Sequence, residues 1–135
     1  MPRLDHVALQ VSDIDRAIAF YRDVLDLPFL FKKEDRDHGE VFAYLELEGG
    51  NLELLARIDA SGQPLPYTPR PVEKPYCPHV ALGVDDLDTA LADLASSNVP
   101  LIDGPLLIPD TVRWLYFSDP DGNIIEYVQW LNKQN

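Results

Sequence analysis

Two histidines and two glutamates recur at the same spacing in the two halves of this chain. Glu53 follows His6 by 47 positions, and Glu126 follows His79 by 47 positions. Glu126 has apolar neighbours on both sides, in a segment typical of a β-strand. A carboxylate in such a setting is costly unless a metal, another cation or a proton compensates its charge. These four residues are therefore the first candidates for chemistry.

The spacing belongs to an internal repeat. A shift of 73 positions places residues 4–13 on residues 77–86 and aligns the two histidines. The chain is therefore expected to contain two copies of one module, each opening with a His-bearing strand and closing with a Glu-bearing strand. The apolar positions after each first strand also align, Ile14, Ala17, Ile18 and Tyr21 with Leu87, Ala90, Leu91 and Leu94.

The first module can be followed from its periodicity. Alternation predicts a strand over residues 3–11 with His6 and Gln10 on one face. Ser12 and Asp13 can cap the helix that follows. The remaining elements are the helix itself, which Pro28 ends, a short strand at 29–33, and a hairpin of strands 41–47 and 52–58 around Gly49-Gly50.

The second module repeats this plan after a proline-rich linker. Pro120 and Gly122 fit a tight turn between the last two strands. The predicted elements are a strand at 78–84, a helix at 85–97, a short strand at 101–104, a connection at 106–111 and the final hairpin at 114–130.

We therefore predict a single α+β domain over residues 1–135. It comprises a first β-α-β-β-β module at 1–58, a linker at 59–77 and a second such module at 78–131. The helices should cover one face of each sheet, and the opposite face should carry the His and Glu side chains.

The composition excludes several classes of function. A net charge of −12 argues against a nucleic-acid partner. No apolar run approaches the roughly 20 residues of a membrane span, so no membrane partner is expected. Cys77 is the one cysteine, which rules out an internal disulfide and fits the reducing cytoplasm, where we expect the protein to reside.

Four segments carry a resemblance to a known family. They read Asp-His-Val-Ala-Leu-Gln-Val-Ser-Asp at 5–13, Ala-Ile-Ala-Phe-Tyr-Arg-Asp-Val-Leu at 17–25, Pro-His-Val-Ala-Leu-Gly-Val at 78–84 and Asp-Pro-Asp-Gly-Asn-Ile-Ile-Glu at 119–126. With them the chain resembles the vicinal oxygen chelate superfamily, which includes glyoxalase I, methylmalonyl-CoA epimerase, fosfomycin-resistance proteins, extradiol dioxygenases and bleomycin-resistance proteins. The ligand pattern is most similar to that of glyoxalase I.

The resemblance implies a glyoxalase-like fold, with tandem modules forming a cupped mixed sheet around a cleft. It implies one divalent metal ion held by His6, Glu53, His79 and Glu126. Imidazole and carboxylate ligands suit Ni, Zn, Co, Mn or Fe and leave room for two substrate oxygens. The implied reaction is that of a lyase or isomerase, in which the vicinal oxygens of a small carbonyl substrate are chelated and a proton moves through an enediolate. The family's habit of pairing modules between chains implies a homodimer.

Two carboxylates are candidates for the general base in this reaction. We favour Glu126, because its apolar strand should raise its pKa once it leaves the metal. Glu53 follows Gly49-Gly50 and is the better candidate for a displaceable ligand. Glu46 is expected opposite Glu53 as a rim carboxylate, and Cys77 as a buried thiol.

The substrate pocket is expected to include Gln10, Trp114 and Tyr116. Bacterial glyoxalase I places an Arg where this chain has Gln10, so glutathione as co-substrate stays open. Two alternatives are an isomerase similar to methylmalonyl-CoA epimerase and a metal-free binding protein of the bleomycin-resistance type. A ring-cleaving dioxygenase is less favoured, because four protein ligands occupy a position that oxygen needs.

Overall fold

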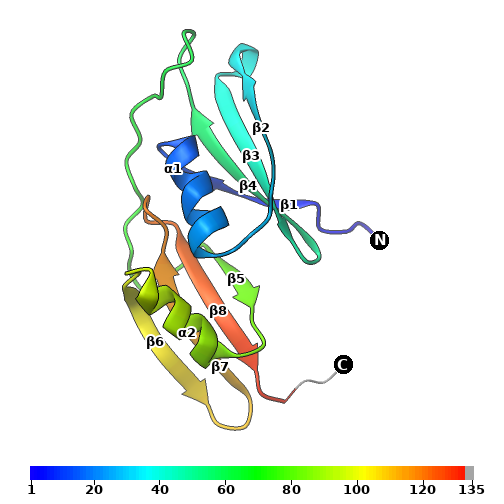
Figure 1. Ribbon diagram of the computed structural model, residues 1–135, viewed down its shortest axis with the longest axis vertical. Helices are drawn as coiled ribbons and strands as arrows, with labels where there is room; N and C mark the ends of the chain where they lie inside the picture. Colours follow the sequence, from blue (N-terminus) through cyan, green and yellow to red (C-terminus); the bar gives the residue numbers. More distant parts are fainter. Residues whose placement is uncertain (133–135) are drawn as a thin grey trace. The chain divides into compact units, whose positions relative to one another are not determined.

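The computed structural model describes residues 1–132. Its chain forms two compact units, Met1–Pro69 and Arg70–Asn135, and each holds one four-stranded sheet (Figure 1). Within residues 1–132, no helix has the length and apolar character needed to cross a membrane.

Unit 1 has the predicted order of elements. Its sheet runs β1-β4-β3-β2, with β1 parallel to β4 and the other pairs antiparallel. The elements are β1 (His6–Gln10), α1 (Ile14–Ala19), the π-helical turn η1 (Phe20–Val24), β2 (Phe29–Asp35), the 3-10 turn η2 (Arg36–His38), β3 (Glu40–Leu47) and β4 (Gly50–Arg57).

Helix α1 begins and ends for local reasons. The Asp13 side chain accepts hydrogen bonds from the backbone N–H groups of Asp15 and Arg16, at 3.0 and 3.1 Å, which satisfies donors that the first turn leaves open. The chain then continues through η1 and leaves the helix at Asp26, whose φ is +60°. The helical segment thus ends before Pro28, close to where the sequence placed its end.

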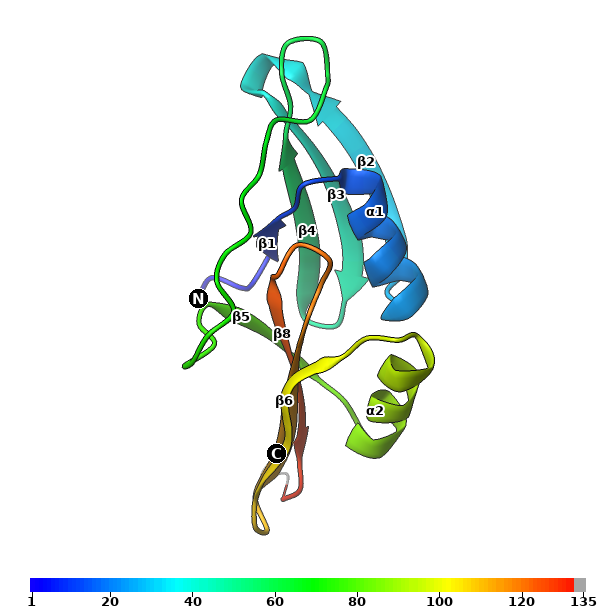
Figure 2. The same ribbon diagram turned by 90° about the vertical axis from the view of Figure 1, so that its left-hand side faces the viewer.

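The core of unit 1 lies between α1 and one face of its sheet. Ile14, Ala17 and Ile18 are buried on α1, and the alternate residues Leu52, Leu54 and Ala56 of β4 are buried beneath it. Figure 2 shows the helix on one side of the sheet. Since side chains alternate along a strand, the other face carries His6, Tyr44 and Glu53.

Unit 2 repeats this topology as β5-β8-β7-β6, with β5 parallel to β8. Helix α2 again covers one face and buries Leu87 and Leu94. The α+β class and the prediction of two β-α-β-β-β modules are therefore confirmed. Its elements are β5 (His79–Gly83), α2 (Leu87–Ser96), β6 (Leu101–Ile108), β7 (Val112–Ser118) and β8 (Ile124–Trp130).

Strand β6 differs from the prediction, which ended it at Gly104 and treated 106–111 as a connection. The strand continues to Ile108 because its pairing with β7 shifts register between Asp103 and Leu106. Gly104 makes this irregularity possible. Its φ is +104°, and a Cβ there would lie 3.0 Å from the Cα of Leu115.

The proline-rich stretch 59–77 is tied to both units. Its first part returns along unit 1, where Leu65 N–H donates to Arg57 O at 2.9 Å and Ile58 bridges to Pro64. At its other end the side chain of Tyr76 packs on Tyr116 of unit 2. The freely extended part is thus shorter than the composition suggests.

The turn before β8 is built around a buried carboxylate. Asp119 accepts hydrogen bonds from the N–H groups of Asp121 and Asn123 and from the Asn123 side-chain amide, each at 2.9 Å. Gly122 takes the left-handed position at φ +82°. This turn fixes where β8 begins and hence where Glu126 lies.

Replacing Asp119 by Ala should destabilise the protein by about 2 kcal/mol, since hydrogen bonds to a charged group are lost and their buried donors stay unpaired. Urea denaturation followed by circular dichroism measures the effect. The exposed Asp93 of α2 provides a control, and its Ala variant should stay within about 0.5 kcal/mol of the parent. An Asp119→Ala protein as stable as that control would contradict the role given to the turn.

Candidate metal centre

The first candidate pair lies on the uncovered face of unit 1. His6 on β1 and Glu53 on β4 come from neighbouring parallel strands, and Nε2 of His6 lies 3.4 Å from Oε1 of Glu53. Nδ1 of His6 lies 2.6 Å from Oδ1 of the adjacent Asp5. This hydrogen bond raises the pKa of His6, and the charge of Glu53 adds to the rise against the opposing effect of burial.

The second pair repeats the arrangement in unit 2. Nε2 of His79 on β5 lies 2.9 Å from Oε1 of Glu126 on β8. Nδ1 of His79 lies 2.8 Å from the backbone carbonyl oxygen of Tyr76. A carbonyl oxygen can only accept, so Nδ1 carries the proton in this contact.

Both pairs have the chemistry of a metal-ligand pair. A histidine that donates from Nδ1 presents the lone pair of Nε2, and metal-bound histidines are held in this way. In unit 2 that nitrogen lies 2.9 Å from Oε1 of Glu126. Such a contact needs a shared proton or a cation. The charged partner of the half-buried Glu126 is therefore His79, together with that proton or cation.

The donors come as one pair in each unit. Within residues 1–132 no group of three or more His, Cys, Asp or Glu side chains gathers into a potential metal site. Each pair supplies one imidazole nitrogen and one carboxylate oxygen, which are donors that suit a divalent metal.

A tyrosine lies beside each His–Glu pair. The sequence predicted Tyr116 as a pocket residue but gave no role to Tyr44. Tyr44 on β3 lies opposite Glu53, and Tyr116 on β7 lies opposite Glu126. The ring centroids lie 5.4 Å from His6 and 5.5 Å from His79, respectively. Burial raises the pKa of both phenols, and the neighbouring Glu adds to the rise, so both keep their protons.

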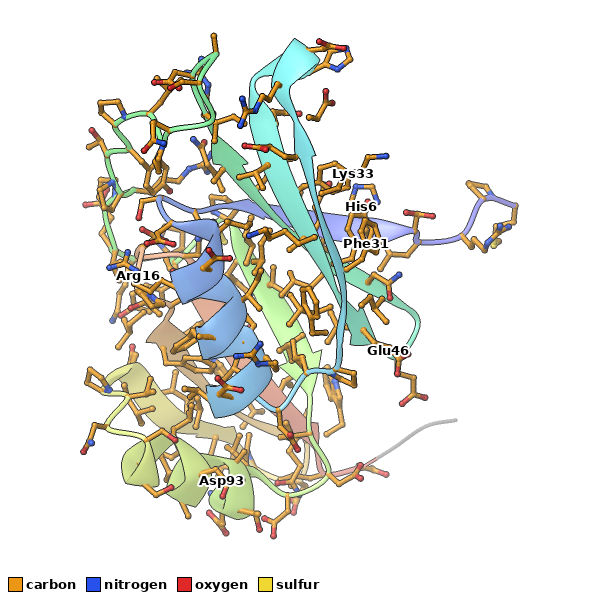
Figure 3. The ribbon with its side chains drawn as sticks, turned by 45° about the horizontal axis from the view of Figure 1, so that its top comes forward. His6, Arg16, Phe31, Lys33, Glu46 and Asp93 are labelled. Atoms are coloured by element: carbon orange, nitrogen blue, oxygen red, sulfur yellow. The ribbon has the colours of Figure 1, made fainter. Side chains whose placement is uncertain are left out.

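Tyr44 also belongs to an aromatic cluster on the uncovered face of unit 1. The ring of Phe31 on β2 is stacked on Tyr44 with centroids 5.2 Å apart, and Phe42 meets both rings edge-on. Figure 3 shows His6, Phe31 and Lys33 close together on this part of the unit. The cluster provides an apolar surface beside the first His–Glu pair. Alternation along β2 and β3 is the sequence signal that could have found it.

Other candidates take different places. Gln10 lies at the end of β1, on the same face as His6 but farther along the strand, and Trp114 is half-buried on the same face as Tyr116. Glu46 lies opposite Asn51, so its predicted pairing with Glu53 was wrong, but it is exposed on the same face as Glu53, as predicted for a rim carboxylate. The prediction of a buried thiol was also wrong, because Cys77 is exposed, with Sγ 3.9 Å from Nδ1 of His79.

Burial does not distinguish the two carboxylates. The side chains of Glu53 and Glu126 are 12% and 14% exposed. Burial raises the pKa of Glu53, an effect that nearby His6 opposes and Glu40 reinforces. The choice of Glu126 as base therefore rests on its strand and turn rather than on a drier setting.

The raised pKa of Glu53 predicts how stability depends on pH. A carboxyl whose pKa is higher in the folded state stabilises the fold fully below its unfolded pKa, about 4.3, and this contribution is lost as the pH rises through the folded value. Glu53→Gln cannot ionise and keeps the contribution. In the presence of a chelator, its urea midpoint should exceed that of the parent at pH 7.5, and the two should converge near pH 4. A difference that is constant with pH would contradict the assignment.

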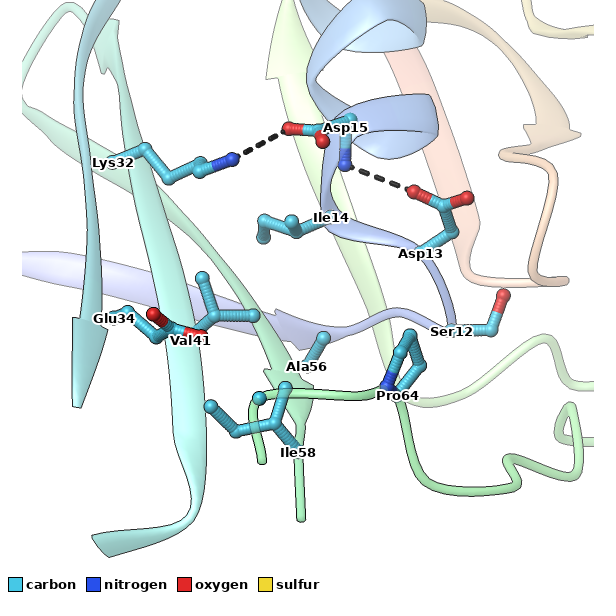
Figure 4. Close-up of a pocket in the computed structure, with 11 residues that line it drawn as sticks. Ser12, Asp13, Ile14, Asp15, Lys32, Glu34, Val41, Ala56, Ile58 and Pro64 are labelled. Atoms are coloured by element: carbon cyan, nitrogen blue, oxygen red, sulfur yellow. Dashed lines mark hydrogen bonds and ion pairs between the residues drawn. The ribbon is translucent and has the colours of Figure 1, made fainter. Parts of the chain in front are cut away.

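A separate pocket of about 380 Å³ lies on the helix-covered side of unit 1 (Figure 4). Val41, Ala56 and Ile58 form an apolar floor. At its rim, Nζ of Lys32 lies 2.9 Å from Oδ1 of Asp15. Because its floor belongs to the face opposite His6 and Glu53, this pocket is distinct from the candidate metal ligands.

Known proteins share this organisation. The sequence pattern of the Glyoxalase/Bleomycin resistance protein/Dioxygenase superfamily matches residues 3–127. Lactoylglutathione lyase of Haemophilus influenzae is 33% identical over 132 residues, covering 92% of this chain and 90% of that protein. Mitochondrial methylmalonyl-CoA epimerase of Bos taurus is 28% identical, covering 94% of this chain and 74% of that protein.

Solved structures with a similar fold also cover nearly the whole chain. The crystal structure of SMU.1112c has a TM-score of 0.77 at 23% identity, covering 95% of this chain and 98% of that one, and it supports the fold alone. TnmS3, an antibiotic binding protein from Streptomyces sp. CB03234, has a TM-score of 0.70 at 25% identity, covering 96% of this chain and 97% of that one. The two modules and the match to the superfamily pattern define a vicinal oxygen chelate protein. This chain belongs to the Glyoxalase/Bleomycin resistance protein/Dioxygenase superfamily.

Proposed function

We propose that this protein is a divalent-metal-dependent lyase or isomerase of the glyoxalase type. Its substrate would be a small carbonyl compound with oxygens on neighbouring carbons. The observation that carries the proposal is the matched geometry of the two His–Glu pairs, each with Nδ1 of its histidine engaged and Nε2 beside a carboxylate. A protein that only sequesters a ligand has no need for two such pairs.

The four residues that would hold the metal are His6, Glu53, His79 and Glu126. When bound, a divalent metal polarises substrate oxygens and makes a neighbouring C–H group more acidic. Glu126 accepts that proton at a carboxylate oxygen and returns it to the adjacent carbon. Tyr116, opposite Glu126 in the sheet, provides an apolar surface beside the carboxylate.

A second candidate is an isomerase similar to methylmalonyl-CoA epimerase. It is favoured by the similar exposure of the two carboxylates, 12% for Glu53 and 14% for Glu126, which leaves either of them able to accept a proton. The same proton chemistry serves both activities, and the substrate distinguishes them.

Purification without chelator, followed by metal analysis and titration with Ni²⁺ or Zn²⁺, tests the proposal. The metal-loaded protein is then assayed with the hemithioacetal of methylglyoxal and glutathione, and with methylmalonyl-CoA in deuterated water. Product thioester from the first substrate supports the lyase, and deuterium incorporation into the second supports the epimerase. A protein that binds neither metal would contradict the proposal and favour a binding protein of the bleomycin-resistance type.

We also propose a homodimer, because each sheet has outer strands with exposed apolar residues. Leu107 and Ile108 on the outer strand β6 are 57% and 50% exposed. An apolar sheet edge of this kind invites pairing with another chain. Analytical ultracentrifugation at micromolar concentration should show a dimer, and Leu107→Lys should weaken it. A parent protein that sediments only as a monomer would overturn this expectation.

A further inference from the structure

Tyr76 takes an unusual backbone conformation immediately before the second histidine strand. Its φ is +62°, in the left-handed region that residues with a Cβ rarely adopt. Its N–H donates to Glu73 O at 2.8 Å, which closes a turn. A conformation of this kind persists only where the surroundings enforce it, and such positions cluster at functional sites.

The side chain of Tyr76 supplies two anchors for this conformation. Its hydroxyl donates to Oδ2 of Asp103 on β6 at 3.1 Å, and its ring lies 4.8 Å from that of Tyr116 on β7. Asp103, Tyr116 and Glu126 lie opposite one another on the neighbouring strands β6, β7 and β8. Tyr76 thus contacts two of the three residues in this cross-strand row, and the third is the candidate ligand Glu126.

The consequence of this turn lies in the backbone carbonyl of Tyr76. That oxygen accepts the Nδ1 proton of His79 at 2.8 Å, so Nε2 is left to face Glu126. In unit 1 the equivalent partner of His6 is the side chain of Asp5, which is 83% exposed. The second histidine is therefore oriented by a fixed backbone group and the first by an adjustable side chain.

We propose that Tyr76 is a positioning residue for His79. By holding its own left-handed turn through Asp103 and Tyr116, it keeps the Nδ1 proton of His79 on its carbonyl oxygen and leaves Nε2, beside Glu126, as the nitrogen that would ligate a metal. The inference rests on the metal-dependent function proposed above. It assigns a role within the site to a residue of the proline-rich segment 59–77.

The tautomer is measured in metal-free protein by ¹⁵N NMR of the histidine rings, at a pH where they are neutral. The parent should show His79 with its proton on Nδ1. Tyr76→Phe, which loses the bond to Asp103, should move His79 partly toward the Nε2-protonated form. Tyr76→Gly tolerates the positive φ but loses both anchors, and it should move His79 further. His6 and His38 serve as internal references and should not change.

Titration with Ni²⁺ alone provides the second readout. Affinity should fall from parent to Tyr76→Phe to Tyr76→Gly, with the last about 10–100-fold weaker, the scale for loss of a group that orients a ligand. Val72→Ala, which shortens an exposed side chain in the same segment, is the control and should bind as the parent does.

The two readouts separate this inference from the proposed function. Variants that keep both the parent tautomer and the parent Ni²⁺ affinity would overturn the role of Tyr76 and leave the proposed function in place. A parent that binds no Ni²⁺ would overturn the metal-dependent function, while the tautomer would still decide whether Tyr76 positions His79.

Discussion

Glu126→Gln should lower turnover by about 100-fold or more, the scale of general-base catalysis, while the protein still binds its metal. An amide oxygen can serve as a metal ligand but cannot accept a substrate proton. Glu126 lies two residues into β8, behind the turn that Asp119 organises, and opposite Tyr116. Its position is thus fixed by the strand and the turn together, as a base that must meet one C–H group requires.

Glu53 is the rival for this role, because the two modules place their carboxylates alike. The discriminating measurement is turnover of Glu126→Gln and Glu53→Gln at matched metal occupancy. Glu46→Gln changes an exposed carboxylate on the same face of unit 1 and should leave turnover near that of the parent. Activity retained by Glu126→Gln and abolished in Glu53→Gln would transfer the base to Glu53.

His79→Ala should weaken metal binding by at least about 10–100-fold. Loss of a residue that only supports a ligand costs this much, and here the ligand itself is removed. The change also leaves Glu126 without the imidazole 2.9 Å away. Calorimetric titration with Ni²⁺ or Zn²⁺ measures the loss. His6→Ala should behave in the same way if both modules contribute to one ion.

The third histidine of the chain supplies the control. His38 lies in the turn η2, with its ring 2.9 Å from a carboxylate oxygen of Asp35, and its side chain is 76% exposed. His38→Ala should bind metal as the parent does. Parent-like affinity in both His6→Ala and His79→Ala would refute the ligand assignment.

Most of the fold could be predicted because local patterns and the internal repeat agree. Alternating residues located β1, the Gly49-Gly50 hairpin located β4, the repeat located β5, and the Asp-Pro-Asp-Gly turn located β8. Strand β6 was underestimated, because a glycine and a proline inside it are ordinarily signs that a strand has ended. Its continuation depends on pairing with β7 across a register shift, which no local pattern records.

The sequence predicted only part of the candidate site, because the alignment of the two repeats does not match the pairing of their strands. The shift of 73 positions that aligns His6 with His79 aligns Tyr44 with Phe117, a fully buried core residue. Strand pairing instead makes Tyr44 equivalent to Tyr116. Tyr76 escaped notice because its importance lies in a backbone carbonyl and a left-handed turn, neither of which depends on a recognisable motif.

The turn between β3 and β4 is shorter than the turn between β7 and β8, and this difference indicates how the two halves of the chain diverged. Glu48 and Gly49 alone join the paired residues Leu47 and Gly50 in one half, whereas residues 119–123 join Ser118 and Ile124 in the other. In both halves a tyrosine still faces the glutamate across the strands. Insertions and deletions in an ancestral duplicated module would thus have been absorbed at the tips, where they leave the facing pairs in step. The same change within a strand would turn the glutamate to the opposite face. The number of residues in a hairpin turn of this fold can therefore change, whereas the number of residues within a strand cannot change by one without moving its side chains to the other face.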